Sequence, residues 1–299
     1  MNLIQIDCKH GKQNILQEEY RRITTATGKA NKAYARATQC AKDLEEAAKN
    51  SVMKAAFTEV AANEIGIVES LSDRDEVFAV ELTTQAIAAR ELAQRLAETA
   101  KKAKIAMKRA TVAKVARKAT TAEAIEEAAA GVATEAERIE ALKTRTKAEQ
   151  LDYAASLAAE YLEHAAMRAA TEATKAIAQA EEIGQLQSAS EEIKKGAEAA
   201  KAVAEIIAKC AAKAKISKQK TKAAAKAAIK ATTSEEGKMA AVTTADTERE
   251  AKDIAKEAST NSILELLLEG GIEKHYVLQT FQRMQYEFNW ENYYDYFVN

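Results

Sequence analysis

Apolar residues recur along most of this chain in alternating steps of three and four, the spacing of one helix lying along another. The clearest run consists of Ala86, Ala89, Ala93, Leu96, Ala100, Ala103, Met107 and Ala110. Alanine methyl groups let two helix backbones approach closely, but they bury less apolar area than leucine side chains. Such a contact must be long to be stable. The pattern therefore predicts long helices that pack through alanine-rich seams.

Breaks in this pattern divide the chain into predicted segments. We expect a lead at residues 1–12, a long-helix bundle over 13–268, and a short helix with an aromatic tail over 272–299. Within the bundle, helices are expected at about 13–69, 73–130, 146–184, 189–232 and 235–268. The boundaries are hydroxyl residues that can cap a helix, and glycines, above all Gly270-Gly271. A single domain of stacked antiparallel helices is the simplest arrangement.

Composition supports this prediction. The 299 residues include no proline and nine glycines, so few positions require a chain break or an unusual backbone angle. Aromatic residues make up 5% of the chain, which is too few for a core of several layers. We therefore predict an all-α fold, namely an elongated antiparallel helical bundle or coiled coil. Charges of both signs at helical spacing favour folded helices over disorder.

The charge balance gives no global field toward nucleic acid or an anionic membrane, because 44 Lys+Arg oppose 45 Asp+Glu. The three cysteines, Cys8, Cys40 and Cys210, have no disulfide or metal spacing and are expected to be free thiols in a reducing compartment. Neither a signal peptide nor a transmembrane helix is predicted. We expect the protein in the cytoplasm or within an assembled particle, with export by a leaderless route as the open alternative.

The C-terminal segment is unusually aromatic. We expect Tyr276, Phe281, Tyr286 and Phe288 to fold back and close the end of the bundle, because their spacing is partly helical. The residues beyond are the candidate docking residues for a partner: Trp290, Tyr293, Tyr294, Tyr296 and Phe297. Tyrosine and tryptophan give large contact areas with few rotatable bonds, so they are typical interface anchors.

Two windows are basic and contain no acid. The first holds Lys101, Lys102, Lys104, Lys108, Arg109, Lys114, Arg117 and Lys118, and the second holds Lys209, Lys213, Lys215, Lys218, Lys220, Lys222, Lys226 and Lys230. Together they could bind phosphates with a strong salt dependence. No aromatic residues are interleaved to stack bases, so we favour pairing with acidic neighbours, such as residues 59–81 or 123–140, over nucleic-acid binding.

No catalytic, cofactor or metal site is predicted. The chain has neither a Gly-x-Ser-x-Gly motif nor a glycine-rich phosphate loop after a strand. His164 has tyrosine three residues before it, so the Glu-x-x-His pair of helical di-iron proteins is missing. His10 and His275 have no further ligands nearby in sequence. We expect a protein that is not an enzyme.

The composition resembles that of alanine-rich coiled-coil structural proteins, among them certain insect silks and phage internal proteins. The sequence therefore favours a structural protein: a helical rod that self-associates, or docks on another structural protein, through its aromatic C-terminus. One alternative is an exported or translocated membrane-active protein, for which residues 263–268 supply an apolar patch before Gly270-Gly271. The second alternative is a nucleic-acid organiser that uses both basic windows.

Removal of residues 290–299 tests the docking hypothesis. We predict that the truncated chain keeps its helical content in circular dichroism and loses assembly in light scattering after size exclusion. A truncated chain that assembles like the full-length protein would contradict the role of the tail.

Overall fold

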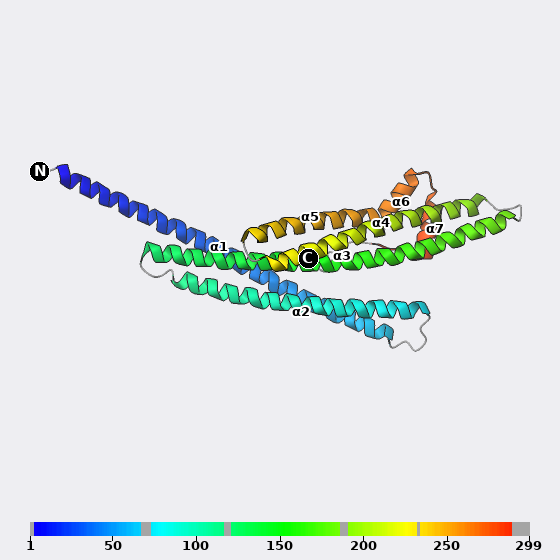
Figure 1. Cartoon of the computed structure of the whole chain (residues 1–299), viewed down its shortest axis with the longest axis horizontal. Helices are drawn as coiled ribbons and strands as arrows, with labels where there is room; N and C mark the ends of the chain where they lie inside the picture. Colours follow the sequence, from blue (N-terminus) through cyan, green and yellow to red (C-terminus); the bar gives the residue numbers. More distant parts are fainter. Residues whose placement is uncertain (1–2, 67–72, 117–120, 186–190, 232–233, 289–299) are drawn as a thin grey trace. The chain divides into compact units, whose positions relative to one another are not determined.

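The chain is almost entirely helical in the part that the structure describes. The computed structural model describes residues 3–66, 73–116, 121–185, 191–231 and 234–288. These ranges contain seven helices and no strand, which confirms the all-α prediction (Figure 1). The helices are α1 (Leu3–Gly66), α2 (Asp73–Ala116), α3 (Ala122–Gln185), α4 (Glu191–Lys230), α5 (Ser234–Ala258), α6 (Thr260–Glu269) and α7 (Lys274–Met284).

The helix boundaries differ from the predicted ones at three places. The helix expected over 235–268 is two helices, α5 and α6, and Ser259 caps the second of them. Helix α1 begins at Leu3, so the expected non-helical lead at residues 1–12 belongs largely to the first helix. The break after α2 lies before Ala122 rather than at Gly131, so α3 begins at Ala122 and not at the predicted residue 146. Thr121 supplies the cap, because its Oγ1 accepts a hydrogen bond from the Ala124 N–H at 3.4 Å. Gly131 lies inside α3, where alanine-rich flanks maintain the helix in spite of the glycine.

The described chain divides into two compact units where the sequence predicts one bundle. Unit 1 consists of residues 1–146 and 232–235, and unit 2 consists of residues 147–231 and 236–299. Helix α3 contributes its first part to unit 1 and its remainder to unit 2. Its continuous seven-residue pattern conceals this division, because a helix that changes partners keeps the same period.

Helices α1 and α2 of unit 1 run antiparallel. Lys114 stacks over the Tyr34 ring at 4.1 Å, Lys104 lies 3.6 Å from Glu45, and Arg90 lies 3.5 Å from Glu59. The residue numbers of each pair add up to 148 or 149, so a single register holds over the whole contact. In the cluster where α1, α2 and α3 meet, the buried side chains are mostly alanine, and Leu44 and Ile139 are its large members.

Helix α3 runs parallel to α1 within unit 1. Two ion pairs between them, Arg22 with Glu126 and Asp43 with Lys143, are 104 and 100 residues apart, so the residue numbers rise together along the two helices. The Lys143 ammonium donates to the Asp43 carboxylate at 2.5 Å and lowers the pKa of Asp43. This pair therefore stabilises unit 1 above the unfolded-state pKa of Asp43, and the contribution is lost as the pH falls through the folded-state pKa.

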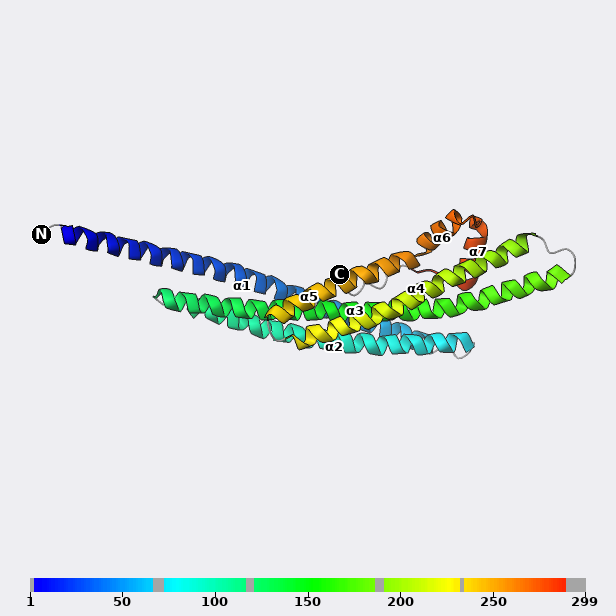
Figure 2. The same ribbon diagram turned by 45° about the horizontal axis from the view of Figure 1, so that its top comes forward.

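Unit 2 packs α4 against the second part of α3, and its core also includes α5, α6 and α7 (Figures 1 and 2). Its largest fully buried aliphatic side chains include Leu162, Val203, Ile207 and Ile263. Threonine also occupies buried positions in unit 2, namely Thr221 on α4 and Thr244 on α5. The Thr244 Oγ1 donates a hydrogen bond to the Ala240 carbonyl at 2.7 Å. This bond to the preceding turn satisfies the hydroxyl without a partner on another helix.

The aromatic residues before position 289 fold back onto unit 2, as the sequence predicts, but they pack against the middle parts of α3 and α4 rather than at the end of these helices. Phe281, Tyr286 and Phe288 belong to its main core cluster, and Tyr276 is buried 3.9 Å from where a Cβ would stand on Gly196. The Tyr286 hydroxyl donates to the Ala258 carbonyl. The Glu287 N–H donates to the Tyr161 hydroxyl at 3.1 Å. These bonds tie the end of the described chain to α3 and α5.

Leucine in the alanine seam is expected to carry much of the stability of unit 1. Leu96 is 1% exposed, so Leu96→Ala should lower the free energy of unfolding by about 2–5 kcal/mol through lost burial and the cavity left behind. Ile105 on the same helix is 52% exposed, and Ile105→Ala should change it by less than about 0.5 kcal/mol. Urea unfolding followed by circular dichroism measures both. If Leu96→Ala and Ile105→Ala lowered the free energy of unfolding equally, the seam would not be the core of unit 1.

Candidate interaction surfaces

The predicted seam of α2 lies mostly inside unit 1. Six of its members are buried, namely Ala86, Ala89, Ala93, Leu96, Ala103 and Ala110, and Ala100 and Met107 are half-buried. Three further residues that the prediction omits are also buried: Leu92, Thr99 and Ala106. The buried face of α2 is broader than a single seam because both α1 and α3 contribute to the same cluster. The Thr99 hydroxyl donates to the Arg95 carbonyl at 2.9 Å, which permits a polar residue there.

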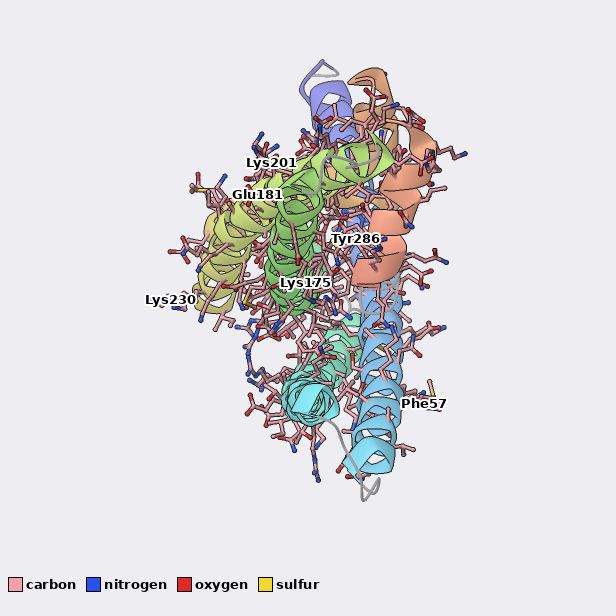
Figure 3. The ribbon with its side chains drawn as sticks, turned by 90° about the vertical axis from the view of Figure 1, so that its right-hand side faces the viewer. Phe57, Lys175, Glu181, Lys201, Lys230 and Tyr286 are labelled. Carbon is pink, nitrogen blue, oxygen red and sulfur yellow. The ribbon has the colours of Figure 1, made fainter. Side chains whose placement is uncertain are left out.

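Helix α1 carries large apolar side chains on its outward face. Met53, Phe57 and Val60 are 55%, 69% and 54% exposed, and they follow one another in steps of four and three. We call these three residues the outer stripe. Their positions lie opposite Ala55 and Ala62, which are buried in unit 1. In Figure 3, Phe57 points away from α1 on the side that does not face α2.

A second uncovered surface lies at the start of α1. Leu16 and Tyr20 are 65% and 72% exposed, and Ile23 is half-buried. These three residues, which we call the end seam, continue the spacing of Ala30, Ala37 and Ala41. The early part of α1 extends beyond the ends of α2 and α3 in both views (Figures 1 and 2). The end seam therefore has the position of a packing face but lacks the helix that covers the same face further along.

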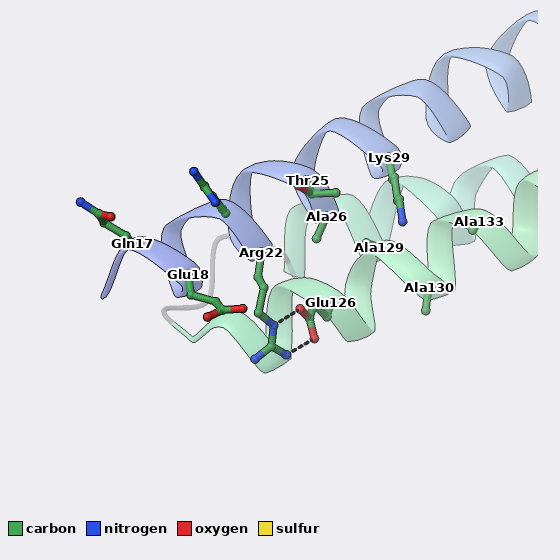
Figure 4. Close-up of a pocket in the computed structure, with 11 residues that line it drawn as sticks. Gln17, Glu18, Arg22, Thr25, Ala26, Lys29, Glu126, Ala129, Ala130 and Ala133 are labelled. Atoms are coloured by element: carbon green, nitrogen blue, oxygen red, sulfur yellow. Dashed lines mark hydrogen bonds and ion pairs between the residues drawn. The ribbon is translucent and has the colours of Figure 1, made fainter. Parts of the chain in front are cut away.

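An open groove of about 790 Å³ lies between α1 and α3 in unit 1 (Figure 4). Ala26, Ala129, Ala130 and Ala133 line it together with charged residues. The Arg22 guanidinium donates two hydrogen bonds to the Glu126 carboxylate, at 2.9 and 2.7 Å, and lowers its pKa. The lining residues include neither histidine nor cysteine, and their one hydroxyl group belongs to Thr25. This arrangement suits ion pairing between helices rather than nucleophilic catalysis.

The second basic window pairs with acids inside unit 2. Four of its lysines contact carboxylates on α3 or α5. The pairs are Lys218–Glu160 at 2.8 Å, Lys215–Glu163 at 4.0 Å, Lys220–Glu250 at 2.6 Å and Lys213–Glu257. In the first window, Lys104 pairs with Glu45. Pairing with acids is therefore confirmed for these five lysines, but the acids lie outside residues 59–81 and 123–140, where we expected them. Helix order, which the charge pattern does not reveal, decides which acids are near.

Neither thiol that the structure describes is set up as a nucleophile. Cys210 is buried and Cys40 is half-buried, and burial raises the pKa of both thiols. Among the described residues, no group of three or more His, Cys, Asp or Glu side chains could hold a metal ion. No helix within the described ranges has an apolar stretch of the length needed to cross a bilayer.

The predicted docking residues Trp290, Tyr293, Tyr294, Tyr296 and Phe297 lie outside the described residues. The outer stripe and the end seam are surfaces that the sequence analysis missed. The sequence contains the pattern that identifies both surfaces, because the apolar residues of each are three and four positions apart. Most seam positions are alanine, and the larger residues at the same spacing do not stand out from core residues in the sequence alone.

Comparisons with protein-family models, curated proteins and solved structures found no match to this chain.

Lysines that pair across α4 should matter more than unpaired ones on the same helix. We predict that reversing Lys218 and Lys220 to glutamate lowers the free energy of unfolding by about 1 kcal/mol at low salt, since two exposed ion pairs become repulsive contacts. Lys209 and Lys222 have no such pair with a described residue, and their reversal should change it much less. Urea unfolding measures both variants. A loss that does not shrink at high salt would contradict an electrostatic cause.

Proposed function

We propose that this protein is a non-enzymatic structural protein that acts by assembly, with helical units that associate with further copies of themselves. The observation that carries this proposal is the outer stripe of Met53, Phe57 and Val60 on α1. A helix that turns alanine toward its own unit and large apolar residues away from it has its stronger contact surface on the outside.

The distribution of side-chain size supports this proposal. The buried residues of α1 are mainly alanine, with Leu44 as the largest. Phenylalanine would remove far more apolar area from water than alanine if it were covered. Scattered exposed apolar residues are ordinary, but three at consecutive helical contact positions form a continuous face. Such a face is suited to a partner helix, which would contact it at positions four and three residues apart.

The two alternative functions find less support. The lysines of the second window that pair with Glu160, Glu163, Glu250 and Glu257 are partly neutralised, which weakens a phosphate-binding belt on α4. The apolar patch proposed for membrane insertion is partly used in the core, because Ile263 and Leu267 are buried. Leu266 and Leu268 remain exposed, so liposome co-sedimentation is the direct test of that alternative.

Phe57→Asp tests the proposal. We predict that this variant keeps its helical content and loses the largest species seen for the unaltered protein in size exclusion with light scattering, since a charge on the stripe opposes burial. Ile87→Asp is the matched control: Ile87 is also exposed, but its helical neighbours Thr83, Arg90 and Glu91 are polar. An unaltered protein that is monomeric at all concentrations would refute assembly.

The variant that lacks residues 290–299 is measured in the same size-exclusion and light-scattering experiment as Phe57→Asp, so that the two candidate contacts can be distinguished. Loss of assembly in the deletion alone would place the contact in the aromatic tail. Loss in Phe57→Asp alone would place it on the outer stripe.

A further inference from the structure

Part of the basic surface on α2 has no acid beside it. Two cations of the first basic window have partners on α1, since Lys104 pairs with Glu45 and Lys114 stacks over the Tyr34 ring. Four others on α2 are exposed and form no ion pair or hydrogen bond with any residue that the structure describes. They are Lys101, Lys102, Lys108 and Arg109.

An apolar side chain lies in the middle of these four cations. Lys101, Ile105 and Lys108 follow one another in steps of four and three, so they lie on one side of α2. Ile105 is 52% exposed. Lys102 and Arg109 lie along one edge of the same side. We call these five residues the basic face; it suits a partner that offers acids around a small apolar surface.

The first part of α3 carries a surface of this kind. Glu127, Ala130, Thr134 and Glu137 are all exposed and follow one another in steps of three, four and three. We call these four residues the acidic face. Neither glutamate forms an ion pair or hydrogen bond with a described residue. The single cation among residues 122–141 is Arg138, which Glu135 holds at 2.8 Å.

The two faces are not paired within one copy. Helices α2 and α3 share a buried cluster of unit 1, but both faces are turned to solvent. The charge pattern of the sequence predicts that residues 123–140 pair with the first basic window. Between the described residues of one copy this pairing is absent, so both sets of charges are available to another molecule.

From this we propose that the pairing occurs between copies: the basic face on α2 of one copy binds the acidic face on α3 of the next. This inference rests on the proposed assembly function and names one of its contacts. The faces match in length, because Lys101 to Arg109 spans about 12 Å and Glu127 to Glu137 about 15 Å at 1.5 Å per residue. Flexible lysine and glutamate side chains bridge the difference.

The middle of each face also fits the other. Ile105 lies between the cations of the basic face, and Ala130 and Thr134 lie between the acids of the acidic face. Small side chains at that place leave room for the larger isoleucine, as in the packing of helix ridges into grooves. Burial of Ile105 adds an apolar contribution that a purely charged contact lacks.

The occupant of the basic face cannot be a second basic face, because Lys101 and Lys108 would then meet like charges. The contact is therefore heterologous, with two different surfaces of each copy involved. Contacts of this type generate rings or open filaments. A nucleic acid or an anionic membrane would bind the basic face without any need for the acidic one, so variants of the acidic face distinguish these occupants from a second copy.

Charge reversal tests the contact in the full-length chain. The parent is Phe57→Asp, which removes the outer stripe as a source of association. We expect this parent to associate reversibly at low salt in sedimentation velocity. Reversal of the basic face by Lys101→Glu with Lys108→Glu should raise the dissociation constant about tenfold or more, and so should reversal of the acidic face by Glu127→Lys with Glu137→Lys.

Lys209→Glu with Lys222→Glu is the matched control. It gives the same net charge as the reversed basic face, but both exposed positions lie on α4. This control should associate like the parent. High salt should weaken the association of the parent, because the contact depends on exposed charges. Circular dichroism checks that each variant is folded.

A mixture of the two reversed variants tests complementarity. Each reversed variant alone has two faces of the same sign, so we expect it to be largely monomeric. In an equimolar mixture, each face of one variant meets a complementary face on the other, and association should return to the level of the parent. Such recovery would also exclude misfolding as the cause of the loss. A mixture that stays monomeric would contradict the inference.

The outcomes separate this inference from the proposed function. If Phe57→Asp is monomeric at low salt while the unaltered protein assembles, the assembly function stands and the charged contact is refuted. If the parent associates and charge reversal does not weaken it, the contact lies elsewhere and the inference fails. If reversal of the basic face alone weakens association, the acidic face is not its partner and the inference also fails. If the unaltered protein is itself monomeric, both proposals fail.

Discussion

Close packing of alanine is the constraint on which the rest of this structure depends. A buried methyl group contributes little apolar burial, so each helix pair gains stability through length rather than through large side chains. The two helices α1 and α3 have 64 residues each, which meets this requirement. Leu96, Ile139, Leu162 and Ile207 add larger buried surfaces at intervals. The core is therefore extended along the helices of each unit instead of being concentrated at a centre.

Electrostatic pairs supply what uniform alanine cannot, namely a preferred register. An alanine seam that slides by one heptad meets another alanine and loses little energy, whereas the ion pairs would be broken. Lys220 with Glu250 and Lys213 with Glu257 have numbers that add up to 470 in both cases, so one register of α4 against α5 forms both pairs. Exposed pairs are individually weak, but several that agree on one alignment disfavour the others.

The distribution of small and large apolar side chains on α1 is also the basis of the proposed function. Because the buried positions of α1 are mainly alanine, its larger apolar residues are exposed and can contact another molecule. The outer stripe and the end seam lie on different parts of that helix, with Phe57 and Tyr20 as their most exposed members.

The sequence by itself determined the all-α fold and the seam of α2, because both depend on spacing along a helix. It did not determine that α7 ends at Met284, so that Tyr286 and Phe288 reach the core from the segment after the helix. It did not determine the helical start of α1 at Leu3 or the break before Ala122, since a weak period and a lone glycine are ambiguous without their neighbours. Only the tertiary structure decided that α3 serves two units, that Lys218 meets Glu160, and that Leu16 and Tyr20 lie beyond the end of α2. These outcomes depend on which helices lie side by side, and a repeated alanine pattern is compatible with many such pairings.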